Sequence, residues 1–446
     1  MKTRALILLL ICFIFCNSFS VAEESTLRIG YWDVRSETVQ GFLKQHQGIT
    51  TTSGNMNART TDDLISSFLT EEFDFDVFPL FTIQYDISPL MEKGYLADLS
   101  RSEEIRDTVK EMREDVAGLV TYENGIYALP YGLLINYMTW QEQAWKDAGF
   151  TEEDVPTTFD EFLDFLENWC SNRKQGFCIF GQFDETVYTE SRYAECLLNM
   201  LFENYMMQSS YAGELLTFDD PQLIERMERC REIGKKLYSL EPIPNQGMPL
   251  FSTDSSSVTD VYRLIPLRMN QNQPRLIKAY LWTVAVNDSS PIQDTAIEFA
   301  KYILHESDYL SALLYKKPRA IRNPYYDETV SSLEKTVADA EEKLRSDSLS
   351  AQAKVKLQEQ LVEAQNELKA YMIPENEYLL TEKQIGDFLT QVDGLYIETP
   401  GPLSIGSENG KLLTQWISSY AAGLTSAQQM IQKLDDISWM IQMEGY

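Results

Sequence analysis

The chain has 446 residues, with 68 acidic and 38 basic side chains and a formal net charge of −30. This excess of negative charge argues against a nucleic-acid partner, because binding of phosphates needs clustered Lys and Arg. Hydrophobic residues make up 44% of the chain, so most of it is expected to fold into two or three domains. The acidity is typical of an exported protein that is kept in solution by its charge.

The N-terminal residues have the pattern of a secretory signal. A positively charged start precedes an apolar run at 5–16, and small residues at 20–22 form a cleavage site. The run is shorter than the ~20 residues of a membrane-spanning helix, so we expect residues 1–22 to be removed. The mature protein is then secreted or held at the extracellular face of the cell envelope. Cys12 and Cys16 follow bulky residues, which disfavours lipid attachment, but free, lipid-tethered and signal-held forms all stay open.

Four cysteines remain after removal of the signal, and export permits three pairings among them. The short spacing favours a disulfide between Cys170 and Cys178, which leaves Cys196 and Cys230 as buried thiols. With two histidines and no CxxC motif, zinc is not expected, and we predict neither a metal site nor a cofactor.

Strand and helix patterns alternate in the first hundred residues. TLRIGYWD at 26–33 alternates apolar and polar residues and predicts a strand, followed by a helix near 37–45. FDFDVFPLF at 73–81 is mostly apolar, which suits a strand buried on both faces, and the next helix ends at Gly94. This alternation predicts an α/β lobe with a mostly parallel sheet.

The pattern changes at NGIYALPYGLLINYMTW, residues 124–140, which opens with an Asn-Gly turn. Pro130 is expected to end the pairing of a strand here, because proline lacks a backbone donor. Thr158 and Glu161 have the spacing of a capping box at the start of a helix. Further helices are predicted at 191–207, 221–238 and 291–307 and after residue 375, with a strand at 279–287.

Residues 327–372 differ from the rest in being rich in charged residues, Ala, Gln and Leu. Apolar residues recur at spacings of three and four from Val330 to Leu344, and again from Leu357 to Tyr371. The two runs predict an antiparallel helical hairpin of coiled-coil type. A self-contained surface insertion and a docking arm for a partner both stay open as its role.

Four segments, in this order, are similar to one known family. FDFDVFPL with ISPLMEKGYLADL resembles its Asp-Val strand, helix and Gly-Tyr-Leu turn, and NGIYALPYG resembles its Gly-x-Tyr-Ala-Leu-Pro signature. WKDAGFTEEDVPTTFDEFLDFLENW is similar to its Ala-Gly and Pro-Thr-Thr pattern, and YAAGLTSAQQMIQKLDDISWMI to its C-terminal helix. The chain thus resembles the extracellular solute-binding proteins of ABC importers, in the group of maltose-binding type that takes sugars and oligosaccharides.

The resemblance implies an α/β fold of two lobes, of the type II periplasmic-binding-protein kind, with a ligand cleft between the lobes. We therefore assign 23–129 with 278–323 to the first lobe and 130–277 with 373–446 to the second. The helical hairpin at 327–372 is extra to the family's pattern and is assigned as an insertion. The stretch PLFSTDSSSVTDVYRLIPLR lacks the Trp that many members have there.

Ligands of open α/β sheets lie beyond the carboxyl ends of strands, and sugar sites combine flat aromatic rings with polar groups. Our candidate ligand-binding residues are Tyr31, Trp32 and Asp33 after the first strand, Gln84 and Tyr85 after the buried strand, Tyr131 at the first crossing and Trp282 at the second. Each has an alternative structural role, which is core packing for the aromatic residues and helix capping for Asp33.

The resemblance implies a monomeric binding protein whose lobes close on a small-molecule solute, a carbohydrate, for delivery to an ABC permease in the membrane. Two other functions stay open: a scaffold that works through the helical hairpin, and a glycan-active enzyme on the same fold. No Gly-x-Ser-x-Gly, HExxH or P-loop motif is present to support the enzyme.

Overall fold

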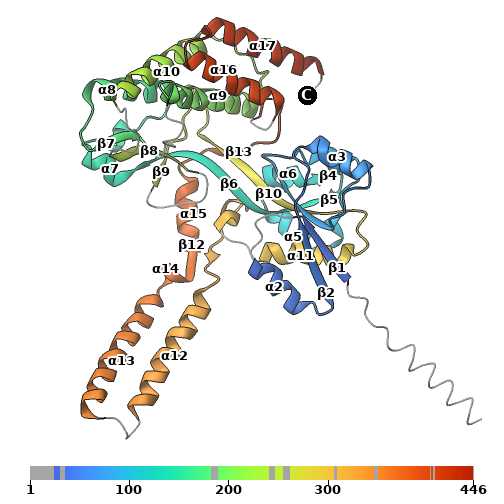
Figure 1. The fold of residues 1–446 in the computed structure, drawn as a ribbon, viewed down its shortest axis with the longest axis vertical. Helices are drawn as coiled ribbons and strands as arrows, with labels where there is room; N and C mark the ends of the chain where they lie inside the picture. The colour runs from blue at the N-terminus through green and yellow to red at the C-terminus, as the bar shows by residue number, and fades with distance from the viewer. Residues whose placement is uncertain are drawn as a thin grey trace, which may run out of the picture.

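Two separate clusters of buried side chains organise the chain. They define the two lobes that Figure 1 shows as ribbons. Lobe 1 is the part that packs around the cluster with Phe78 and Val284, and lobe 2 the part around Trp145 and Met430. The computed structural model describes residues 25–30, 36–181, 189–240, 247–254, 262–305, 309–345, 350–401, 403–404 and 407–444.

Lobe 1 contains the predicted alternation of strand and helix. β1 (Ser25–Gly30), β2 (Ile49–Gly54) and β3 (Val77–Phe81) are parallel, whereas β10 (Leu276–Val286) pairs antiparallel with β3. The sheet is therefore mixed rather than mostly parallel, because β10 enters it on its way back from lobe 2. The larger helices are α2 (Ser36–Gln45), α3 (Thr61–Leu69), α5 (Glu103–Glu111), α6 (Glu114–Val120) and α11 (Gln293–His305).

Short elements complete lobe 1. They are α4 (Ser88–Glu92), the 3-10 helices η1 (Leu99–Arg101) and η4 (Tyr309–Leu313), and the hairpin of β4 (Thr121–Tyr122) with β5 (Gly125–Ile126). Glu123 and Asn124 form the turn of this hairpin and Gly125 begins β5, so the turn lies one residue earlier than the Asn-Gly pair predicted.

Three strands join the lobes. β6 (Ala128–Gln141) begins in the core of lobe 1 and ends in that of lobe 2. The chain returns to lobe 1 before β10, which pairs antiparallel with β6, and leaves it after β13 (Gly394–Ile397), which pairs parallel with β10. The three strands form one hydrogen-bonded ribbon between the lobes, with β10 in the middle (Figure 1).

Pro130 lies inside β6, opposite Thr283 of β10, so the expectation that it ends the pairing is wrong. In the described part of the chain, residues 128–136 of β6 pair only with β10. A proline is tolerated at such an edge, because its missing N–H faces away from the ladder.

Lobe 2 is mainly helical around β7 (Phe177–Phe180), β8 (Met248–Asp254), β9 (Tyr262–Leu264) and the end of β6. Its helices are α7 (Glu142–Asp147), η2 (Glu152–Asp154), α8 (Phe159–Asn172), α9 (Arg192–Ala212), α10 (Pro221–Leu240), α16 (Glu408–Ala421) and α17 (Ala427–Glu444). The capping box that starts α8 is confirmed, since Thr158 and Glu161 exchange both hydrogen bonds. α9 and α10 approach closely, because a Cβ at Gly234 would lie 2.4 Å from the backbone nitrogen of Ala194.

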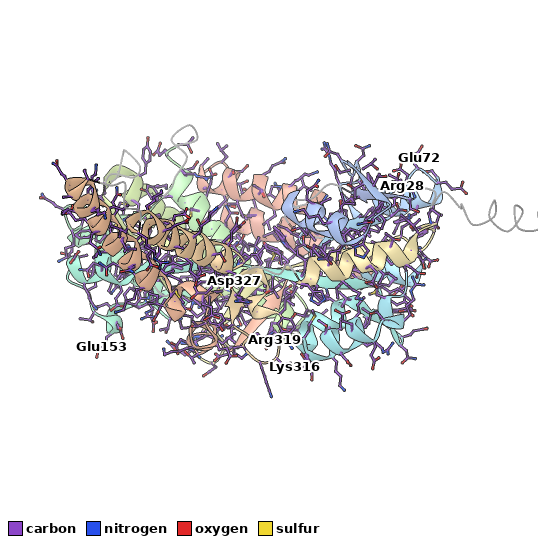
Figure 2. All side chains as sticks on the ribbon, turned by 90° about the horizontal axis from the view of Figure 1, so that it is seen from below. Arg28, Glu72, Glu153, Lys316, Arg319 and Asp327 are labelled. Atoms are coloured by element: carbon purple, nitrogen blue, oxygen red, sulfur yellow. The ribbon has the colours of Figure 1, made fainter. Side chains whose placement is uncertain are left out.

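Helices α12 (Tyr326–Leu344) and α13 (Ala351–Tyr371) lie side by side and extend away from both lobes (Figure 1). We call these two helices the arm. At its base the rings of Tyr326 and Tyr371 stack, with centroids 5.7 Å apart. Figure 2 shows Arg28 and Glu72 of lobe 1 at one end of the molecule and Glu153 of lobe 2 at the other, with Asp327 of the arm between them.

The chain leaves the arm where it entered. β11 (Ile321–Arg322) pairs with β12 (Tyr378–Leu380), and the backbone N–H of Asn323 donates to the carbonyl of Glu377 at 2.9 Å. After α14 (Pro374–Glu377), helix α15 (Glu382–Leu389) buries Ile385 and Phe388 in the core of lobe 1. The segment up to β13 therefore packs on lobe 1, whereas 373–446 was expected in lobe 2. The segment belongs to lobe 1 because the apolar face of α15 is buried in the core of that lobe.

No disulfide joins the four cysteines that follow the predicted signal, all of which are described. The favoured pair of Cys170 with Cys178 is not formed. Cys178 is buried, and its thiol donates to the carbonyl of Phe180 at 3.5 Å. Burial raises the pKa of the Cys196 thiol to about 11 and that of the fully buried Cys230 further still.

Residues 1–22, the predicted signal, lie outside the described part of the chain. Within the described ranges, no helix is long and apolar enough to cross a membrane.

Candidate functional site

The predicted ligand-binding residues fall into three groups. Tyr31, Trp32 and Asp33 lie outside the described residues, directly after β1. Gln84 and Tyr85 are engaged within lobe 1: the Gln84 amide donates to the carbonyl of Arg59 at 3.2 Å and to the Tyr85 hydroxyl at 2.9 Å.

Tyr85 itself is only 3% exposed, and its hydroxyl donates to the carbonyl of Ala58 at 2.8 Å. Burial, with Asp63 nearby, raises the pKa of Tyr85 to about 12. Its contacts are therefore those of a residue that holds the turn after β3 against residues 58–63.

The third group, Tyr131 and Trp282, is brought together by an irregularity in β6. Trp282 pairs with Gly132 and the next residue, Thr283, pairs with Pro130, so Tyr131 is an extra residue in a β-bulge. A bulge re-aims a side chain, and bulges are frequent beside functional sites. The Tyr131 and Trp282 ring centroids lie 6.1 Å apart in an edge-to-face arrangement.

Phe81, the last residue of β3, completes this aromatic group at 5.0 Å from Trp282. Thr82 fixes the end of β3 against β10, since it exchanges hydrogen bonds of 2.9 and 3.0 Å with Leu281. Phe81, Tyr131 and Trp282 are each partly exposed. We call these three residues the aromatic group; they lie where the carboxyl end of β3 meets the crossing strands.

The same face of β10 leads from the aromatic group to lobe 2. Side chains alternate along a strand, so Trp282, Tyr280 and Lys278 share one face. The Lys278 ammonium lies over the Tyr280 ring, 5.6 Å from its centroid. Lys278 is paired across the ladder with Asn136 of β6, so polar groups succeed the aromatic ones toward lobe 2.

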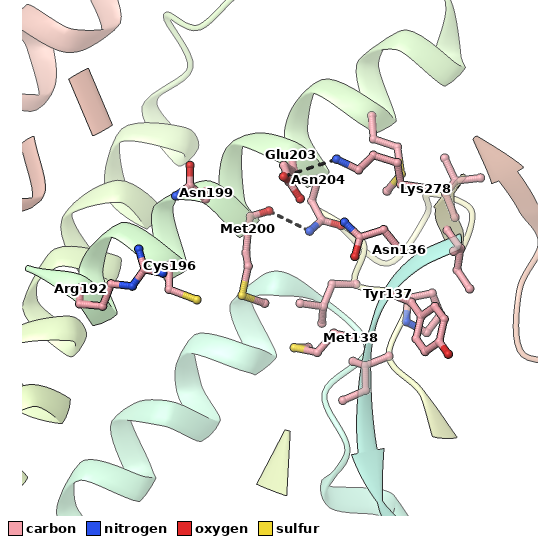
Figure 3. Close-up of a pocket in the computed structure, with 16 residues that line it drawn as sticks. Asn136, Tyr137, Met138, Arg192, Cys196, Asn199, Met200, Glu203, Asn204 and Lys278 are labelled. Carbon is pink, nitrogen blue, oxygen red and sulfur yellow. Dashed lines mark hydrogen bonds and ion pairs between the residues drawn. The ribbon is translucent and has the colours of Figure 1, made fainter. Parts of the chain in front are cut away.

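A pocket of about 320 Å³ lies here, between β6, β10 and α9 (Figure 3). We call it the strand-side pocket, and its polar lining residues are Asn136, Arg192, Asn199, Glu203, Asn204 and Lys278. The Asn204 amide is held by the Met200 carbonyl at 2.8 Å. Within the described part of the chain, the side-chain amides of Asn136 and Asn199 have no hydrogen-bond partner, which leaves them available to a solute.

A second pocket of about 630 Å³ lies on the other side of α9, against α16, α17 and the segment after β13. This helix-side pocket shares Asn199, Glu203, Met207 and Lys278 with the strand-side pocket, so the two adjoin. Its wall is largely apolar, with Phe202, Met206, Leu403, Leu413 and Ile417 among its lining residues.

Lys278 is the electrostatic centre of both pockets. Its Nζ lies 3.4 Å from a carboxylate oxygen of Glu203 and 3.4 Å from one of Glu398, while its side chain is 10% exposed. Burial alone would lower the pKa of Lys278, but the two carboxylates outweigh it and raise the pKa, so the ammonium stays charged. Burial also raises the pKa of Tyr280 to about 12, which keeps its hydroxyl protonated at neutral pH.

Sequence reasoning missed the contribution of α9. Arg192, Cys196, Asn199 and Glu203 recur at spacings of three and four within an otherwise apolar helix, so they lie on one face. A lysine at position 278, in an apolar strand, is a second such signal, since a buried charge needs a partner.

Two lobes joined by a three-stranded ribbon, with aromatic and polar groups along that ribbon, define a hinged two-lobe binding fold. Residues 37–248 match the family model of bacterial extracellular solute-binding proteins. The match and the fold confirm the resemblance found in the sequence, that of an extracellular solute-binding protein. None of the curated proteins compared with the chain matches it.

Solved structures share this fold over nearly the whole chain. They include an ABC substrate-binding protein of Listeria monocytogenes in complex with cycloalternan, with 10% identity and a TM-score of 0.52, covering 94% of this chain and 99% of that one. Maltose-bound MalE3 of T. maritima has 14% identity and a TM-score of 0.53, with the same coverage of 94% and 99%. A chitin oligosaccharide binding protein also has 14% identity and a TM-score of 0.53, covering 94% and 99%. At these identities the likeness establishes the fold alone.

Proposed function

We propose that the protein binds a carbohydrate at the junction of its lobes and delivers it to the permease of an ABC importer. The observation that carries this is the continuous face of β10, on which the aromatic group is followed by polar groups of the strand-side pocket. Sugar rings present C–H faces to aromatic rings and hydroxyls to amides and carboxylates, so this succession suits them. The solved structures of this fold that hold cycloalternan and maltose support the same class of solute.

Tyr31, Trp32 and Asp33 remain part of the proposed site. They follow β1 in the sequence, and the parallel pairing of Ile29 with Val77 puts the carboxyl ends of β1 and β3 at the same edge of the sheet. In such sheets this edge is where ligands bind.

Binding would close the lobes about the three-stranded ribbon. A solute drives closure only if it binds the closed state more tightly than the open one, so contacts from both lobes are needed. The aromatic group belongs to lobe 1 and α9 to lobe 2, which meets that need. We propose further that the protein acts outside the cytoplasm as a monomer and binds its solute without converting it.

The test is thermal unfolding of the protein without residues 1–22 against mono- and oligosaccharides, with peptides as controls. A ligand of the native state raises the melting temperature by mass action. Small-angle scattering with the best ligand should show compaction. A rise with peptides and none with sugars would overturn the carbohydrate class, and conversion of a bound glycan into product would indicate an enzyme.

A further inference from the structure

The helix-side pocket carries more negative than positive charge. Its described lining residues include three carboxylates, from Glu203, Glu214 and Glu398, and one ammonium, from Lys278. Lys278 lies between Glu203 and Glu398, so a single positive charge already serves two carboxylates. Glu214 lies on the exposed rim and adds to the excess.

The excess negative charge of the helix-side pocket is only partly screened by water. The Glu398 side chain is 22% exposed and that of Glu203 39%, beside an apolar wall that contains Phe202 and Leu413. Charges in such surroundings interact more strongly than they do in bulk water. A neutral solute that fills the pocket would displace water from these carboxylates without supplying a counter-charge.

A protonated amine on the solute would supply the missing counter-charge. An ammonium group can donate to carboxylate oxygens that Lys278 leaves unused, and charge-assisted hydrogen bonds of this kind are the stronger ones. Hydroxyl-bearing residues in the same lining, Thr399, Ser404 and Thr414, suit the hydroxyls of a sugar. Both kinds of group are thus present in one cavity of about 630 Å³.

From this cavity we propose that the solute is an amino sugar, whose protonated amine pairs with Glu398 and Glu203 in the helix-side pocket. The inference rests on the proposed function, since the helix-side pocket adjoins the strand-side pocket and would take the amine-bearing part of the same sugar. It also predicts a dependence on ionic strength, because the attraction between the amine and the pocket is screened by salt.

The test compares two probes on the same sugar frame by calorimetry at pH 6. One is the β-1,4-linked disaccharide of glucosamine, whose amines are protonated, and the other is its N-acetylated, neutral form. We expect a Kd about tenfold lower for the amino form, equivalent to about 1.4 kcal/mol, with the difference reduced in high salt. Glu398→Gln should remove most of the difference, while its melting temperature verifies that the variant is folded.

Each outcome decides between the two ideas. Tighter binding of the amino form, lost in Glu398→Gln, supports the inference. Equal or tighter binding of the acetylated form overturns it and leaves the carbohydrate proposal standing. No binding of either disaccharide overturns it as well, and if spermidine alone binds, both the amino-sugar inference and the carbohydrate proposal fail. Should Glu398→Gln not fold, the rim variant Glu214→Gln is used, where we expect a smaller loss in the same direction.

Discussion

Arg28 donates three hydrogen bonds to Asp76, from its backbone nitrogen and Nε to one carboxylate oxygen and from Nη2 to the other, at 2.8, 3.0 and 2.8 Å. Arg275 donates hydrogen bonds to Asp393 from the same three atoms, at 2.8, 3.2 and 2.7 Å. The side chain of Asp76 is 0% exposed and that of Asp393 46%, and Asp76 also accepts a hydrogen bond from Ser290 at 2.7 Å. Comparison of the two pairs therefore measures what a buried, fully hydrogen-bonded setting adds to the same Arg–Asp geometry.

We predict that Asp76→Asn lowers the free energy of unfolding by about 2–4 kcal/mol, because it leaves Arg28 without its counter-charge and weakens the link between β1 and β3. Asp393→Asn should cost less than about 1 kcal/mol, since solvent screens the exposed pair. Urea unfolding at pH 7 measures both. Equal losses would show that burial is not what makes the Asp76 pair stabilising.

The same pair has a pH signature. Burial alone would raise the pKa of Asp76, but hydrogen bonds from Arg28 and Ser290 outweigh it and lower the pKa below its usual value. Its contribution is therefore full above the unfolded pKa of about 3.9 and is lost as pH falls through the folded value. Unfolding at pH 7 and pH 3 should show the gap between wild type and Asp76→Asn narrowing in acid. A gap that stays constant down to pH 3 would contradict this.

Lys278→Met should destabilise the protein by about 1–3 kcal/mol, because Glu203 and Glu398 then face each other without a cation. Since the pKa of Lys278 is raised, its contribution is present below the unfolded value of about 10.4, and the loss should not vary between pH 6 and 9. Lys383→Met is the control, as its side chain is 83% exposed in an ion pair with Asp387. Equal unfolding midpoints for the two variants would show that Lys278 does not stabilise the fold more than an exposed lysine does.

Trp282→Ala should weaken carbohydrate binding by about five- to tenfold, because one lost aromatic contact costs about 1–1.5 kcal/mol. Trp439→Ala is the matched control, as Trp439 is 62% exposed on α17. Calorimetry with the best sugar of the panel measures both affinities. If the two substitutions leave the affinity alike, the aromatic group lies outside the solute site.

Replacement of residues 326–371 by a short Gly-Ser linker should leave solute affinity unchanged and lower the melting temperature of the lobes by less than a few degrees. The reason is that Asn323 and Glu377 already hold the two ends together, so the linker closes a short gap at little entropic cost. Calorimetry and thermal unfolding of the shortened chain test this. A loss of binding in a folded product would make the arm part of the site.

Local pattern predicted the elements whose signals lie close together in the chain. The capping box at Thr158 and the apolar runs of β3 and β10 are confirmed, because capping and burial leave their mark within a few residues. Pro130 was misjudged, since its tolerance depends on which side of β6 the partner strand lies. The side on which the partner strand lies is a property of the assembled sheet and not of the residues next to Pro130 in the sequence.

The site was predictable only in part for the same reason. Tyr131 and Trp282 were expected near the crossings and do contact each other, but the bulge that aims Tyr131 requires the register of two strands far apart in sequence. The charged centre depends on still more distant segments, since Lys278 meets Glu203 of α9 and Glu398 after β13. The sequence marks Lys278 and Glu203 as unusual in their own segments, but it does not show that the three residues pair with one another.

The three-stranded ribbon between the lobes has mechanical properties that differ with direction. β10 is hydrogen-bonded to β6 on one side and to β13 on the other, so sliding one strand past the next would break ladders that hold over several residues. Bending the ribbon out of its plane leaves those bonds intact. We therefore expect closure of the lobes to proceed by bending of this ribbon about a single axis, because bending keeps both ladders intact and in-plane shear does not.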